Sequence, residues 1–164
     1  MKRAAALAIC LALAGCGGSS RHAASIATTI ADTTPQPPGH ALYAGGEWAV
    51  SLSGGTATAY HLAGGTWRAD RQGAVRIAIL GPKRGAKAAA VPQVAVELSA
   101  PKPLVESGLW VDGEELQVKG GGLTPTKGTI YGAPLASLAK GTHTAVAYGR
   151  TATTASAVAW TFRV

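Results

Sequence analysis

The chain has 164 residues and a formal net charge of +7, and 47% of its residues are hydrophobic. Its two cysteines, Cys10 and Cys16, both lie near the start. We therefore expect no disulfide and no cysteine metal ligand in the rest of the chain, even in a compartment that permits disulfides.

Residues 1–15 have the pattern of a signal peptide. Lys2 and Arg3 precede an apolar stretch at residues 4–14, which is the order of charge and hydrophobicity in secretory signals. A membrane-spanning helix needs about 20 apolar residues, so this stretch is too short to remain as a span. We predict that it is removed.

The signal ends in Leu13-Ala14-Gly15-Cys16, which resembles the lipobox of bacterial lipoproteins at every position. The resemblance implies cleavage before Cys16 and attachment of a diacylglyceryl group to its thiol. Buried acyl chains contribute about 0.8 kcal/mol per methylene, so two or three chains hold a protein at a membrane. The implied location is extracytoplasmic. The alternative is an ordinary cleaved signal that contains a cysteine near its cut site.

Residues 16–39 are predicted to form the lipidated cysteine and a disordered tether. Ser, Thr, Ala and Pro dominate this segment, and its apolar residues are too sparse to bury. A flexible coil of this length would reach roughly 25 to 30 Å. The tether would therefore lift a folded part off the bilayer.

Residues 40–73 are predicted to form a small three-stranded β-meander. Gly45-Gly46-Glu47-Trp48 and Gly64-Gly65-Thr66-Trp67 are similar, and glycine pairs are typical of hairpin turns. We place the strands near residues 48–52, 56–62 and 67–70. A sheet of this size is marginally stable alone, so we expect it to pack on the C-terminal part of the chain.

Residues 74–164 predict an antiparallel β-sandwich, so the fold class is all-β. Val158, Trp160 and Phe162 alternate with smaller or polar residues, the period of a half-buried strand. Similar apolar stripes occur at residues 75–79 and 94–98. Asp112-Gly113 suits the positive φ angles of a tight hairpin turn. Many short strands with glycine-rich turns are typical of sandwiches and barrels.

The same region resembles the immunoglobulin-like domains of bacterial surface and secreted proteins. The resemblance lies in "GLWVDGEEL", "LASLAKGTHTAVAYG" and the closing "AWTFRV". It implies an immunoglobulin-like sandwich in which Trp110 is a candidate core tryptophan. It implies little about activity, because this fold carries many unrelated functions.

We find no sequence pattern for a catalytic residue, a cofactor or a metal site. The chain has no Gly-x-Ser-x-Gly motif, a usual setting of an activated serine. Its histidines are not spaced as local metal ligands. They are His22, His40, His61 and His143.

Two groups of titratable residues allow both a functional and a structural interpretation. His143 could be a metal ligand or proton carrier, but we favour a structural role in which its ring bonds backbone near a turn, where sandwiches often carry a corner tyrosine. Asp112, Glu114 and Glu115 could form an acid–base pair or a cation site. We interpret them as a turn aspartate and two solvated glutamates.

Cations concentrate in one stretch of the sequence, which we predict as a possible anion-binding patch. Such a patch attracts anions within a Debye length of about 8 to 10 Å. The nearest anions to a membrane-tethered protein would be lipid headgroups, cell-wall polymers or another envelope protein, and we expect no nucleic acid. A generally basic soluble surface is the alternative. The patch comprises Arg68, Arg71, Arg76, Lys83, Arg84, Lys87 and Lys102.

Together these features predict a non-enzymatic, lipid-anchored envelope protein that binds or spaces a partner. The alternative is a metal-handling protein, because the chain from Leu135 onward also resembles copper-resistance sandwich proteins. Those proteins carry an Asp-Gly-His ligand segment between the last two strands, whereas residues 149–154 hold no ligand. Copper binding would need His40 and His143 to converge.

Overall fold

The computed structural model describes residues 35–70 and 73–164, which belong to one compact unit spanning Thr33–Val164. These residues form twelve β-strands and no helix, so the predicted all-β fold is confirmed. Within this part of the chain no helix is long and apolar enough to cross a membrane. The predicted signal peptide, Cys16, the tether up to residue 34 and Arg71 lie outside the described residues.

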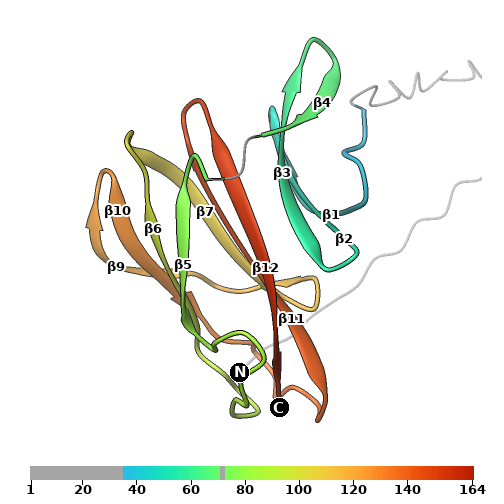
Figure 1. Cartoon of the computed structure of the whole chain (residues 1–164), viewed down its shortest axis with the longest axis vertical. Coiled ribbons are helices and arrows are strands. Elements are labelled where there is room, and N and C mark those ends of the chain that lie inside the picture. The colour runs from blue at the N-terminus through green and yellow to red at the C-terminus, as the bar shows by residue number, and fades with distance from the viewer. Residues whose placement is uncertain (1–34, 71–72) are drawn as a thin grey trace, which may run out of the picture. The chain divides into compact units, whose positions relative to one another are not determined.

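The first four strands form a meander, called sheet A, in the order β1-β2-β3-β4 (Figure 1). The three predicted strands are present, but β1 was not predicted. A bulge between Ala41 and Tyr43 interrupts the pairing of β1 with β2, and a bulge breaks the two-residue period that identifies a strand. The bounds are β1 (His40–Gly45), β2 (Trp48–Ser53), β3 (Thr56–Ala63) and β4 (Thr66–Ala69).

The rest of the chain forms two more antiparallel sheets of four strands each. Sheet B has the order β5-β6-β10-β9, and sheet C has the order β12-β11-β7-β8. The strands of sheet B are β5 (Arg76–Gly81), β6 (Val94–Ser99), β9 (Lys119–Thr124) and β10 (Lys127–Gly132). The strands of sheet C are β7 (Leu104–Val111), β8 (Glu114–Glu115), β11 (Thr142–Thr151) and β12 (Ala155–Arg163).

Sheets B and C pack face to face on an apolar core. Val94, Val96 and Leu98 from β6 are at most 1% exposed and join Trp160 and Phe162 from β12 in one cluster. Burying a side chain of this size contributes about 1.5–3 kcal/mol. The predicted apolar stripes are confirmed, since their alternate residues line this core.

Sheet C is the middle of three layers, because its other face is covered by sheet A (Figure 1). Along β11, Ala145 and Ala147 join the core with sheet B. The intervening Val146 and Tyr148 pack with Trp48 of β2. A strand buried on both faces has an almost continuous apolar sequence, which explains the run from Ala145 to Tyr148. The predicted packing of the meander on the C-terminal sheets is therefore observed.

Trp110 lies on the opposite face of sheet C from the one expected for a sandwich-core tryptophan. Leu109 and Val111 enter the core with sheet B, whereas Trp110 enters the cluster with sheet A. Its ring lies over Gly108, where an added Cβ would be 2.4 Å from Trp110 Cη2. Gly108 therefore leaves the space that this indole occupies.

The Asp112-Gly113 turn between β7 and β8 has the predicted conformation. Asp112 has a φ of 51° and Gly113 a φ of 91°. Positive φ at both central residues is the geometry of a type I′ hairpin turn. This turn fixes the position of the Asp112 side chain beside β11.

After β5, residues 85–88 cross to sheet C and run along the outer edge of β12. Gly85 N–H donates to Thr161 O at 2.7 Å, Arg163 N–H to Ala86 O at 2.9 Å, and Ala88 N–H to Arg163 O at 2.7 Å. These bonds satisfy backbone groups that an edge strand would leave open. They also hold Arg84 and Lys87 beside the end of β12.

Candidate functional site

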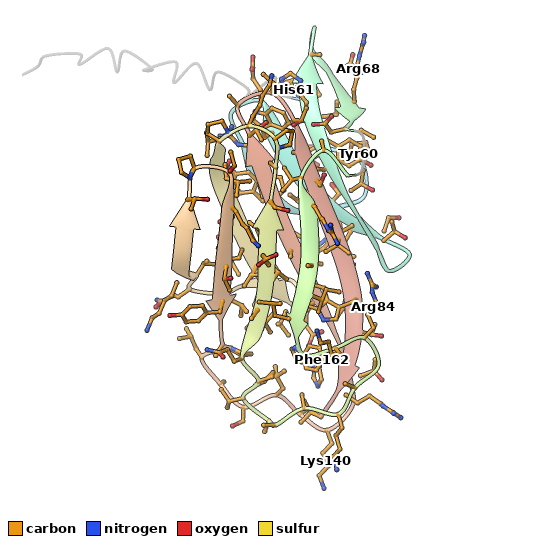
Figure 2. The ribbon with its side chains drawn as sticks, turned by 60° about the vertical axis from the view of Figure 1, so that its left-hand side comes forward. Tyr60, His61, Arg68, Arg84, Lys140 and Phe162 are labelled. Carbon is orange, nitrogen blue, oxygen red and sulfur yellow. The ribbon has the colours of Figure 1, made fainter. Side chains whose placement is uncertain are left out.

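The structure places the predicted basic residues in separate regions rather than on one surface. Arg68 is on β4, Arg76 begins β5, and Lys102 follows β6. Lys83, Arg84 and Lys87 instead follow the far end of β5, a strand of about 16 Å at roughly 3.3 Å per residue. Figure 2 shows Arg68 and Arg84 toward opposite ends of the described unit.

Two residues from the C-terminal strands and their turn, Lys140 and Arg163, lie at the same end of the molecule as Lys83, Arg84 and Lys87. Arg163 pairs with Lys87 in an isolated parallel bridge. Thr142 pairs with Arg163, and Gly141 exchanges two backbone hydrogen bonds with Val164, at 3.2 and 3.0 Å, which places Lys140 two residues from the Thr142–Arg163 pair. Figure 2 shows Lys140 at the end of the molecule opposite Arg68, with Phe162 between Lys140 and Arg84. We call this group the basic end: Lys83, Arg84, Lys87, Lys140 and Arg163.

The cations of the basic end are exposed and are not neutralised by nearby acids. Lys83 Nζ donates to Ile79 O at 2.7 Å, and Arg84 Nη1 donates to Ala159 O at 2.9 Å. These carbonyls fix the two side chains without cancelling their charge. The salt bridges found within residues 35–70 and 73–164 involve none of the five cations. Their charges therefore add to a positive potential at this surface.

Lys140 and Arg163 could hardly be recognised from the sequence as members of this group. They are far along the chain from Lys83, and only the pairing of β11 with β12 brings them to the same end. The sequence indicated only that Arg163 is exposed, because it falls on the polar side of the alternation in β12. Such a residue is exposed, but alternation does not say which other loops lie beside it.

His143 connects the start of β11 to the β7–β8 turn. Its Nε2 lies 2.8 Å from the carbonyl oxygen of Ala139, which is the backbone bond predicted for a structural role. Its Nδ1 lies 2.6 Å from Asp112 Oδ2, a contact that the sequence did not indicate. Asp112 Oδ1 also accepts the Thr144 N–H at 2.8 Å. The turn carboxylate is therefore bonded to β11 at two points.

The contacts of His143 favour its charged form. A carbonyl and an ionised carboxylate only accept hydrogen bonds, so both ring nitrogens must donate, and only the imidazolium has two N–H groups. The hydrogen bond with Asp112 is the main cause that raises the pKa of His143 above 6.5, and the bond with Ala139 adds to it, against the opposing effect of burial.

This pairing predicts a pH dependence of stability. Because the folded pKa is raised, the contribution of His143 is fully present below about pH 6.5 and is lost as pH rises through the folded value. His143→Gln is expected to flatten the change in unfolding free energy between about pH 5.5 and pH 8.5, where histidines titrate. Urea unfolding at each pH measures this change.

Asp112→Asn is a second test of the His143–Asp112 pairing, because it removes the carboxylate but keeps the size of the side chain. It should flatten the same pH profile as His143→Gln. A wild-type profile that does not fall over this range, or an unchanged slope in both variants, would contradict the assignment of a charged His143.

The remaining titratable candidates do not assemble into a metal site. Glu114 and Glu115 are exposed on β8. His40 approaches the neighbouring turn, with Nε2 3.8 Å from a Cβ built on Gly113, whereas His61 stacks on Trp48 with ring centroids 4.4 Å apart. Over the described part of the chain, no group of three or more His, Cys, Asp or Glu residues could hold a metal ion.

A second polar cluster joins sheet A to sheet C. Tyr43 Oη donates to Glu106 Oε1 at 2.5 Å, and Arg150 Nε donates to Glu106 Oε2. The Arg150 guanidinium also lies 5.4 Å from the centroid of the Trp48 ring. The hydrogen bond to Glu106, followed by burial, raises the pKa of Tyr43 to about 12. This cluster fastens the two sheets and leaves Tyr43 protonated at neutral pH.

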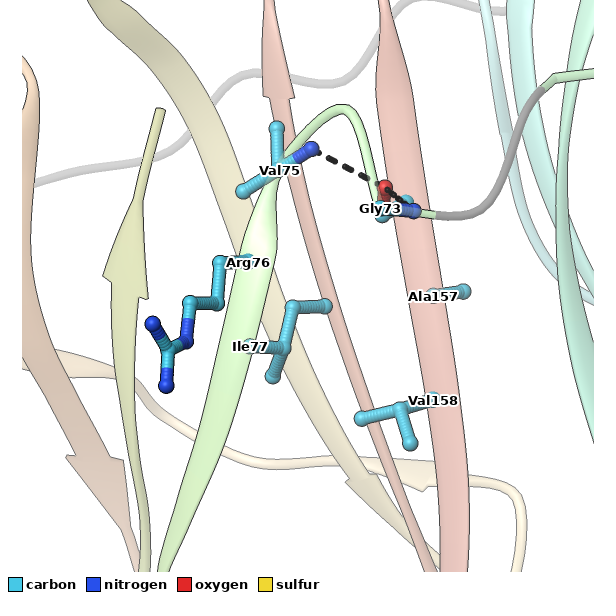
Figure 3. A pocket seen from close by; sticks show the side chains of 7 residues that line it. Gly73, Val75, Arg76, Ile77, Ala157 and Val158 are labelled. Atoms are coloured by element: carbon cyan, nitrogen blue, oxygen red, sulfur yellow. Dashed lines mark hydrogen bonds between the residues drawn. The ribbon is translucent and has the colours of Figure 1, made fainter. Parts of the chain in front are cut away.

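A hollow of about 350 Å³ opens between the edges of β5 and β12 (Figure 3). Its walls include Val75, Ile77 and Val158, and Arg76 is the charged residue among the described ones that line it. Ser156 Oγ accepts the N–H groups of Gly73 at 3.2 Å and Val75 at 3.1 Å. A nucleophilic serine needs a base within reach, and no described lining residue is one. The hydroxyl serves to hold the chain where it enters β5.

Comparison with known proteins identifies no relative: no family model matches the chain, and no curated protein matches it. Among the surface features of residues 35–70 and 73–164, the basic end gathers several like charges from separate segments on an accessible surface. Such a surface can bind and orient anionic groups.

Proposed function

We propose that this chain is a non-enzymatic, lipid-anchored protein of the cell envelope, whose basic end binds an anionic envelope polymer. The observation that carries the proposal is the convergence of Lys83, Arg84, Lys87, Lys140 and Arg163. Backbone pairing holds their segments together. A repeating polyanion can contact several of these cations at once, which multiplies weak single contacts.

The strand order supports an immunoglobulin-like assignment for residues 74–164. If β5, β6, β9 and β10 are lettered A, B, D and E, sheet B has the order A-B-E-D. Sheet C then has the order G-F-C, with β8 added beside C. An immunoglobulin sandwich has the same two orders, ABED and CFG, which supports this part of the proposal. The fold itself assigns no ligand, so the basic end supplies the functional part of the proposal.

The point at which the tether joins the folded unit favours a polymer over the headgroups of the protein's own membrane. The chain continues toward Cys16 from Pro35, whose carbonyl accepts the indole N–H of Trp67. Trp67 precedes Arg68, which lies away from Arg84 and Lys140 (Figure 2). The basic end is therefore directed away from the point where the tether meets the folded unit.

The test uses a chain that begins at residue 17 and keeps every described residue. It is mixed with polyglycerol-phosphate wall polymer or with phosphatidylglycerol vesicles, at about 0.1 M and about 1 M salt, where the Debye length is about 10 Å and 3 Å. We expect binding to the polymer that is lost at the higher salt. Binding to vesicles alone, or no salt-sensitive binding, would contradict the proposal.

The anchor is tested separately through Cys16. In a cell that processes lipoproteins, Cys16→Ser is expected to move the protein from the membrane fraction to the soluble fraction, because the acyl chains supply the membrane affinity. Intact-mass measurement of the wild-type product should show a chain that begins at a lipid-bearing Cys16. An unmodified thiol or a different first residue would contradict this part of the proposal.

A further inference from the structure

Sheet A has an aromatic face on the side away from sheet C. Trp48 and Val50 point toward sheet C, so the alternate residues of β2, Ala49 and Ser51, point the opposite way. Ala49 pairs with Tyr60 of β3. On the same side, Leu62 of β3 pairs with Trp67 of β4. We call this surface the outer face: Ala49, Ser51, Tyr60, Leu62 and Trp67.

The outer face is covered by the chain itself. Ala49 is 0% and Ser51 2% exposed, although both point away from the sandwich. The indole N–H of Trp67 donates to the carbonyl oxygen of Pro35 at 2.5 Å. At the other end of the segment, a Cβ built on Gly39 would lie 3.6 Å from Ser51 Cβ. Residues 35–39 therefore pass from β4 over to β2 (Figure 1).

The covering segment, Pro35-Gln36-Pro37-Pro38-Gly39, has the sequence of a polyproline II helix. Proline fixes its own φ, and a following proline holds the preceding residue in an extended conformation. A polyproline II helix rises about 3.1 Å per residue, so four steps cover about 12 Å, close to the roughly 10 Å across two strand spacings. Pro37 is half-buried while its neighbours are exposed, as expected for a helix with three residues per turn.

The chemistry of the outer face suits such a helix. The carbonyl groups of polyproline II have no internal hydrogen-bond partners, and the Trp67 indole supplies a donor for one of them. Ser51 Oγ is buried and has no hydrogen-bond partner among the described residues, so it offers a second donor beneath the segment. Aromatic grooves with such donors are a general means of recognising proline-rich peptides.

We propose that the outer face is a docking surface for a proline-rich segment of a partner protein, and that residues 35–38 occupy it in the resting chain. The internal segment is joined directly to β1, so its effective concentration is in the millimolar range typical of short linkers. A partner must therefore compete with it. Displacement of residues 35–38 would release them from sheet A, and these residues connect the folded unit to the segment that contains Cys16. This inference does not depend on the basic end.

The test compares the wild-type chain with a released variant that carries Pro35→Ala, Pro37→Ala and Pro38→Ala. The probe is a synthetic peptide of residues 33–39, Thr-Thr-Pro-Gln-Pro-Pro-Gly, and binding is followed through the NMR signal of the Trp67 indole N–H. We expect the released variant to bind the peptide at least tenfold more tightly than the wild type. A peptide with all three prolines replaced by alanine is the control and should not bind.

Trp67→Phe in the released variant keeps a ring but removes the donor, and should weaken binding by about three- to tenfold, the worth of one hydrogen bond. This variant has no indole signal, so its binding is followed through the backbone amide of Leu62, which pairs with residue 67. Equal binding of the alanine peptide, or a folded released variant that does not bind, would overturn the proposal. If the released variant does not fold, the wild-type chain is titrated with millimolar peptide that carries a nitroxide spin label at its N-terminus. Broadening of the Trp67 signal supports docking, and a signal that is not broadened overturns it.

Discussion

Trp110→Ala is expected to lower the free energy of unfolding by about 3–5 kcal/mol, the usual cost of deleting a buried large aromatic side chain. Trp110 is 2% exposed and packs between sheet C and sheet A. Gly108 has no side chain that could fill the space, so a cavity would remain. Urea unfolding of both proteins at one pH gives the difference.

Leu135→Ala is the matched control for this prediction. Leu135 is 92% exposed, and truncating an exposed side chain usually changes stability by no more than about 0.5 kcal/mol. If Trp110→Ala lowers the free energy of unfolding by as little as Leu135→Ala does, the Trp110 side chain does not hold sheet A on sheet C.

The triple variant Lys87→Gln, Lys140→Gln and Arg163→Gln is expected to bind polyglycerol-phosphate polymer about 100-fold more weakly than the wild-type chain at about 0.1 M salt. Near an anionic surface each Lys or Arg contributes about 1 kcal/mol, and each 1.4 kcal/mol is about tenfold in affinity. The three side chains are exposed, so their replacement should not disturb the core. Sedimentation with the polymer measures the change.

The control for this variant removes the same charge elsewhere: Arg68→Gln, Arg76→Gln and Lys102→Gln. These residues are also exposed but lie outside the basic end. If binding depends on net charge alone, the two variants will lose affinity equally, and the basic end is then not a site. We expect the control to retain binding within a few fold of the wild type.

The sequence was most informative where a strand has one buried face. On β6, Val94, Val96 and Leu98 alternate with less buried residues, and that period predicted both the strand and its core side. The glycine pairs and Asp112-Gly113 were equally informative, because positive φ angles restrict the choice of residue.

The sequence was least informative where both faces of a strand are buried. On β7 the run Gly108–Val111 is buried throughout, so alternation could not show that Trp110 faces sheet A. The members of the candidate site could not be predicted for a related reason. Lys140 lies at the same end of the molecule as Lys87 only because separate strands and loops pair there, and His143 contacts Asp112 through the same long-range order.

The pairing of residues 85–88 with β12 has a consequence for molecules that share one surface. If copies are anchored to one membrane, they are present at high local density, and an unpaired edge strand could then pair with a strand of a neighbouring copy. At the end of β12, the backbone groups of Thr161 and Arg163 are already paired by residues 85–88 of the same chain. A neighbouring copy therefore finds these donors and acceptors occupied, and crowding does not favour sheet extension at this end of the strand.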